Sequence, residues 1–142
     1  MTAEEIGALL AGSRKVQIAT LNPDGSVHLV TMFYAMVEGH IAFWTYRASQ
    51  KARNLARDPR ITCLVEDGTD YFELRGVQIA GEVRTVEDPE GILAIGRLVA
   101  GGMAGAPAGA LDDYVTHAAR KRLGYLVEPR QVISWDHRKL LS

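Results

Sequence analysis

The sequence has a single cysteine, Cys63, among its 142 residues, so no disulfide can form within one chain. One thiol also provides too few ligands for a cysteine-based zinc site. No apolar run approaches the roughly 20 residues of a membrane-spanning helix. Residues 1–15 begin with acidic residues and lack the basic and apolar parts of a secretion signal. These absences predict a soluble, cytoplasmic protein.

Strong net charge and common catalytic motifs are absent as well. The formal net charge is −1, which argues against a strongly basic, nucleic-acid-binding protein. Neither GxSxG nor GxGxxG occurs, which argues against a hydrolase triad and a dinucleotide fingerprint. The histidines lack metal-binding spacing, so no metal site is expected. They are His28, His40, His117 and His137.

What is present is the composition of an ordinary folded domain, with 47% hydrophobic and 23% charged residues. The length predicts one domain over residues 1–142. Apolar periodicity and turn residues predict short helices at residues 3–11, 49–57, 89–100 and 111–120. Strands are expected at residues 15–21, 26–37, 40–46, 60–66, 71–86 and 123–135. This order predicts a mainly β (α+β) fold, a six-stranded antiparallel barrel with short peripheral helices.

Three of the expected strands have unusual patterns. Residues 26–37 are apolar on both faces, so the second face must be covered by a helix, a ligand or another subunit. The apolar phase of residues 71–86 slips once, which predicts a β-bulge or bend near Gly76. Glu128 and Pro129 interrupt the final strand.

Charges of one sign gather in separate parts of the chain. Residues 47–60 contain five basic residues and one acid, residues 66–90 contain eight acids and two basic residues, and residues 120–139 contain six basic residues and two acids. Within the first cluster, Arg47, Ser49 and Lys51 stand where a strand passes into a helix. Free N–H groups at a helix start, a hydroxyl and two cations suit a phosphate. The alternative is an ordinary solvated surface.

The segments IATLNPDGSVHLVTMFY, TYRASQKARNLARDPRITCLVEDG and YFELRGVQIAGEVRTVED occur in this order. Together they resemble the split β-barrel flavin and deazaflavin oxidoreductases, which are relatives of pyridoxamine 5′-phosphate oxidase. The closing SWDHRKL is similar to a mycobacterial-type branch grouped as users of the deazaflavin coenzyme F-420. The resemblance extends over residues 3–140.

The resemblance implies a homodimer that pairs through a sheet face and has two cofactor sites at the interface. It implies three groups of residues around each cofactor, the last of them contributed by the same chain or by the partner subunit. These are Met32, Phe33 and Tyr34 at the ring, Thr45, Arg47, Ser49, Gln50, Lys51 and Asn54 around the phosphate, and Trp135, His137 and Arg138 from the far end of the chain.

The implied activity is hydride transfer between F-420 and a small organic substrate, with FMN as the alternative cofactor. The proton would come from solvent, Tyr34 or His137. The chain lacks the longer C-terminal segment associated with pyridoxamine phosphate oxidases, which argues against vitamin B6 oxidation. Two other functions stay open: a carrier of flavin, deazaflavin or tetrapyrrole without turnover, and a structural or regulatory dimer without a cofactor.

Overall fold

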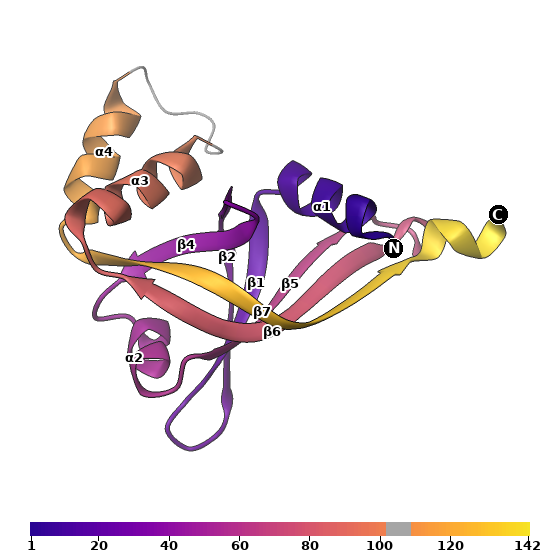
Figure 1. Cartoon of the computed structure of the whole chain (residues 1–142), viewed down its shortest axis with the longest axis horizontal. Helices are drawn as coiled ribbons and strands as arrows, with labels where there is room; N and C mark the ends of the chain where they lie inside the picture. The colour runs from indigo at the N-terminus through magenta and orange to yellow at the C-terminus, as the bar shows by residue number, and fades with distance from the viewer. Residues whose placement is uncertain (102–108) are drawn as a thin grey trace.

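Antiparallel strands form most of the structure, a computed structural model that describes residues 1–101 and 109–142 (Figure 1). Within these residues, seven strands make one sheet in the order β2-β1-β5-β6-β7-β4-β3, and every neighbouring pair is antiparallel. The strands are β1 (Lys15–Leu21), β2 (Val27–Phe33), β3 (Ala35–Val37), β4 (His40–Tyr46), β5 (Arg60–Asp67), β6 (Arg75–Val86) and β7 (Arg122–Asp136). The predicted fold class, a mainly β split barrel with short helices at its periphery, is confirmed.

The two ends of this sheet are consecutive in the chain, because a single residue, Tyr34, separates β2 from β3. β2 pairs with β1 at one end of the sheet, whereas β3 pairs with β4 at the other. The chain therefore turns a corner at Tyr34 and curls the sheet into a barrel. The prediction of one unbroken strand over residues 26–37 is wrong at this corner, and the count of seven strands instead of six has the same cause.

The corner is stabilised from inside the barrel. The Tyr34 side chain is only 4% exposed, and its hydroxyl donates a hydrogen bond to the carbonyl of Leu10. Leu10 belongs to α1 (Ala3–Gly12), whose Leu9 and Leu10 complete the hydrophobic core within the barrel. A capping box begins α1: the Thr2 hydroxyl accepts from the Glu5 amide, and the Glu5 carboxylate accepts from the Thr2 amide.

β4 and the first part of β7, at residues 124–127, are buried on both faces. One face of each strand points into the barrel, where the rings of Phe43 and Tyr125 stack with centroids 5.1 Å apart. The other face carries Trp44 and Leu126 into a second core beneath α3 (Pro89–Ala100) and α4 (Ala110–Ala119). No helix in the described part of the chain is long and apolar enough to cross a bilayer.

The region before β6 differs from the prediction. Tyr71–Glu73 forms a 3-10 turn, η1, and β6 begins only at Arg75. The apolar phase slips because residues 71–74 precede the strand and do not follow its alternation. No bulge occurs at Gly76. The ladder instead shifts between Ala80 and Gly81, where β7 contains one residue more than β6. The expected interruption of the last strand is therefore a β-bulge just after Pro129, which has no N–H to donate.

β6 and β7 form an arm that runs away from the helical end of the molecule (Figure 1). The arm ends in a second 3-10 helix, η2 (His137–Leu141), on the side opposite to α3 and α4. Cys63 lies in β5 beside this arm. It is fully buried, and its burial raises the pKa of the thiol to about 12.

We expect Gly81→Ala to destabilise the barrel. A Cβ atom at Gly81 would lie 2.1 Å from the backbone oxygen of Glu128, so the β6–β7 ladder must shift. Overpacking of this kind costs about 1–3 kcal/mol. Gly7→Ala is the matched control, because a Cβ atom there meets nothing within 4 Å on the exposed side of α1, and alanine should gain about 0.5–1 kcal/mol in a helix. Urea denaturation measures both free energies of unfolding, and a Gly81→Ala chain as stable as the wild type contradicts this account.

Candidate functional site

A pocket of about 330 Å³ opens where the ends of β2 and β4 meet the start of α2 (Gln50–Arg57) and the helical layer. This volume lies at the lower end of the range for small-molecule sites. The lining residues combine aromatic and apolar walls with two threonine hydroxyls, two tyrosine hydroxyls and two cations. They are Thr31, Met32, Phe33, Trp44, Thr45, Tyr46, Lys51, Val99, Tyr114 and Arg122.

The turn from β4 into α2 fixes one side of the pocket. Ser49 is the N-cap of α2, and its hydroxyl accepts a 3.2 Å hydrogen bond from the amide of Ala52. The Thr45 hydroxyl donates to the Ser49 oxygen over 3.3 Å. Lys51 therefore stands in the first turn of a helix, at the end where the peptide dipoles contribute positive potential.

The pocket is electropositive. Burial, together with the nearby positive charge of Arg122, lowers the pKa of Lys51 below its usual value. No carboxylate lies within ion-pair distance of Lys51 or Arg122 in the described residues. The Nε atom of Arg122 is shielded from solvent and has no hydrogen-bond partner there either. Two neighbouring cations without a counter-charge give this pocket a positive potential, which an anion would relieve.

Four of the predicted site residues line this pocket: Met32, Phe33, Thr45 and Lys51. Ser49 contacts it through Thr45. Arg47 lies beside it, where its Nε atom donates over 3.3 Å to the carbonyl of Arg122. The pairing of β4 with β7 brings Arg47 and Arg122 together.

Three other predicted residues are engaged elsewhere. The Tyr34 hydroxyl is bonded to Leu10, and burial raises its pKa to about 12. The Asn54 amide is fully buried; it donates to Thr20 and Asn22, each over 3.0 Å, and accepts from Gln50 over 2.9 Å. Gln50 and Asn54 thus tie α2 to the β1–β2 turn and do not line the pocket.

The predicted residues near the C-terminal end lie at the far end of the arm. Trp135 covers Gly76, where a Cβ atom would come within 2.3 Å of the indole ring. The His137 Nδ1 atom is 2.8 Å from the carbonyl oxygen of Tyr71. Arg138 pairs with Asp136 at 2.7 Å, and hydrogen bonds from Arg138 lower the pKa of that carboxyl to about 2. Within one chain the structure does not bring these residues to the pocket (Figure 1).

Several lining residues were not predicted, above all Arg122, Tyr46 and Tyr114. Trp44 is both buried in the second core and part of the pocket wall. The signal for Arg122 was present, since it belongs to the basic cluster at residues 120–139. Arg122 lies next to the basic cluster at residues 47–60 only because β7 pairs with β4 across the sheet.

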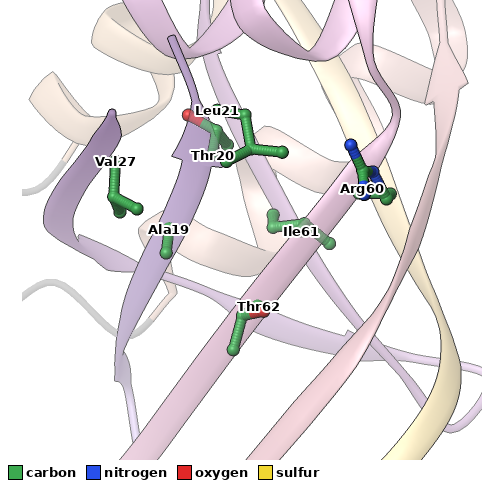
Figure 2. Close-up of a pocket in the computed structure, with 7 residues that line it drawn as sticks. All are labelled: Ala19, Thr20, Leu21, Val27, Arg60, Ile61 and Thr62. Carbon is green, nitrogen blue, oxygen red and sulfur yellow. The ribbon is translucent and has the colours of Figure 1, made fainter. Parts of the chain in front are cut away.

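A second hollow, of about 210 Å³, lies on β1 and β5 (Figure 2). Its walls are mostly small or apolar side chains such as Ala19, Val27 and Ile61. The one charged side chain that lines it, Arg60, is paired with Asp58 at 2.7 Å. This hollow therefore lacks the uncompensated charge of the first pocket.

Residues 2–135 match the protein family described as pyridoxamine 5′-phosphate oxidase. The chain belongs to this family. The resemblance to split-barrel flavin and deazaflavin proteins is thereby confirmed. Among curated protein sequences, none matches the chain significantly.

Solved structures of other members of this fold superpose on the chain. A conserved hypothetical protein of Mycobacterium tuberculosis is 40% identical, with a TM-score of 0.91 over 100% of this chain and 89% of its own. An F420 reductase is 23% identical, with a TM-score of 0.69 over 93% and 98% of the two chains. The heme storage protein HutZ from Vibrio cholerae is 14% identical, with a TM-score of 0.72 over 92% of each chain. The last two likenesses show a shared fold.

We expect phosphate to stabilise the folded chain through Lys51. An anion relieves the repulsion between the two cations, and binding at ten times Kd adds roughly 1.4 kcal/mol to the free energy of unfolding. Because the pKa of Lys51 is lowered, the amine loses its charge at a lower pH than a free lysine, and the stabilisation should fall with it. Thermal melts in phosphate and in chloride at equal ionic strength measure the effect. Lys51→Met is the control, and equal stabilisation of both proteins would rule out an anion site at Lys51.

Proposed function

We propose that this protein is an oxidoreductase that binds the deazaflavin coenzyme F-420 in the pocket beside Lys51 and transfers hydride to or from a small organic substrate. The observation that carries the proposal is the pair of uncompensated cations next to an apolar wall formed by Met32 and Phe33. A phosphate on a planar, largely apolar ring system has the same two parts. The shared fold with an F420 reductase supports this choice of cofactor.

The residues present suit such a group. Lys51 and Arg122 would hold the phosphate, and Thr45 and Ser49 would place hydroxyls near it. Phe33 is 40% exposed at the pocket, where it offers a surface for a ring. When bound, the cofactor supplies the hydride chemistry, so the protein need only bind and orient the reactants.

Solvent is the proton donor that agrees best with the geometry. The Tyr34 hydroxyl donates a hydrogen bond to the carbonyl of Leu10 inside the barrel, away from the pocket. His137 lies at the far end of the arm, beside Tyr71. No histidine or carboxylate lines the pocket in the described residues.

FMN is the alternative cofactor, because it shares the tricyclic ring and a phosphate. F-420 differs in its oligoglutamate tail, which needs further basic groups. Arg138 and Lys139 are paired with Asp136 and Glu5, at 2.7 and 2.9 Å. Arg53, on the exposed side of α2, is the basic residue that we propose for the tail.

A carrier without turnover is the second candidate function. The lack of a histidine or carboxylate among the described lining residues favours it, and the shared fold with a heme storage protein agrees with it. Bound cofactor that is never oxidised or reduced across a broad panel of substrates would distinguish the carrier from the enzyme.

We also propose that the protein is a homodimer. The outer face of β2 leaves Val27 and Leu29 59% and 64% exposed, next to Phe33 at the pocket. Apolar rows of this kind commonly mark a protein interface. A two-fold partner on this face would cover the row and complete the pocket.

Titration with oxidised and reduced F-420 and with FMN tests the proposed cofactor, and we expect micromolar or tighter binding of F-420. Lys51→Ala should weaken this binding by about 1.5–3 kcal/mol, the contribution of one charge-assisted hydrogen bond. Lys121→Ala, which removes an exposed charge outside the pocket, should leave the affinity unchanged. No binding of any of the three ligands by the wild-type protein refutes the proposed function.

Light scattering tests the proposed dimer. Leu29→Asp should convert it to monomers, because a charge would be buried in the interface. Leu98→Asp is the control, since Leu98 is 53% exposed on α3, away from β2. A wild-type protein that is monomeric at micromolar concentration contradicts the proposal.

A further inference from the structure

Arg122 is held in place by two aromatic rings. It is the first residue of β7 and stands opposite Tyr46, the last residue of β4. Its guanidinium carbon lies 4.8 Å from the ring centroid of Trp44 and 4.1 Å from that of Tyr46. Both distances are within the range of cation–π attraction. The charge is therefore positioned before any ligand arrives.

The Trp44 ring is itself immobilised. Trp44 is 4% exposed, and α3 approaches it at Gly96, where a Cβ atom would lie 2.5 Å from the ring. The absence of a side chain at Gly96 allows the helix and the ring to pack in direct contact. The ring under Arg122 therefore belongs to the rigid second core.

The Arg122 Nε–H donor is incompletely satisfied. The Nε atom is shielded from solvent and, within the described residues, finds no acceptor. Buried donors almost always have a partner in folded proteins. Arginine presents its donors as a planar fork that matches the oxygens of a phosphate, whereas a lysine offers a point charge.

We infer that Arg122 is the residue that anchors the phosphate of the cofactor and distinguishes ligands with that phosphate from ligands without it. Lys51, across the same pocket, adds a second charge. The inference rests on the proposed function, because it assigns a residue to the phosphate part of that site.

The test compares ligands that differ only in the phosphate. FMN is paired with riboflavin, and the 5′-phosphate of the F-420 deazaflavin is paired with the same deazaflavin without phosphate, so that the oligoglutamate tail is absent from both members of the pair. Dissociation constants are measured for the wild type, Arg122→Met and Arg122→Lys. Lys121→Met is the matched control, because it removes the neighbouring charge from an exposed residue outside the pocket.

We expect Arg122→Met to weaken binding of the phosphate-bearing ligand at least tenfold and to change the affinity for its phosphate-free partner less than twofold. Arg122→Lys should recover part of the loss, and Lys121→Met should resemble the wild type. Arg122→Met should also shift the alkaline loss of phosphate binding to higher pH, since the pKa of Lys51 is no longer lowered by Arg122. A residue that only supports the fold would not produce this shift.

Two results would overturn the inference: an unchanged affinity for the phosphate-bearing ligand, or an equal loss for both members of a pair. Should the wild type bind none of the four ligands, the proposed function fails instead. Inorganic phosphate then decides the role of Arg122, because thermal stabilisation by phosphate that Arg122→Met retains in full refutes the anchor and one that it abolishes supports it.

Discussion

A single segment of chain forms both ends of the sheet, and the rest of the structure depends on how that segment bends. The Tyr34 side chain points into the barrel, where its hydroxyl donates a hydrogen bond to the carbonyl of Leu10 in α1. Because β2 stops immediately before this residue, Thr31 and Phe33 lie beside the end of β4. The same bend that closes the barrel thus creates one wall of the pocket.

The electropositive character of the pocket comes from two elements that are far apart in sequence. β4 leads into α2 and provides Lys51, and β7 provides Arg122 from the other side. The second core, beneath α3 and α4, orients Trp44 below the guanidinium. The two positive charges can lie close together because aromatic rings stabilise that of Arg122, and because Lys51 is still partly exposed to solvent.

Local signals in the sequence were sufficient for most of the fold. Thr2, Ser49 and Pro59 mark helix ends by capping and by their own backbone restrictions, and the strand at residues 15–21 begins and ends where expected. The corner at Tyr34 could not be predicted in this way. Residues 26–37 are apolar on both faces whether they form one strand or two, and only the pairing with β1 and β4 decides between them.

The candidate site was predicted best where its residues are neighbours in sequence. Lys51, Ser49 and Thr45 share one strand-to-helix turn, so they could be found together. Asn54 belongs to the same helix, but its amide faces the barrel, a difference of orientation that composition does not reveal. Arg122 reaches the pocket through the register of β4 with β7, which is a property of the whole sheet.

That register also bears on when the pocket forms during folding. The β1–β2 hairpin closes a short loop, whereas the pairing of Tyr46 with Arg122 closes one of the longest loops in the chain. Long-range closures are slow because their entropic cost precedes the contacts that compensate it. An intermediate with its hairpins formed would contain Lys51 and α2 but no Arg122 beside them. An anion site that needs both cations would therefore be complete only once the last strand has paired.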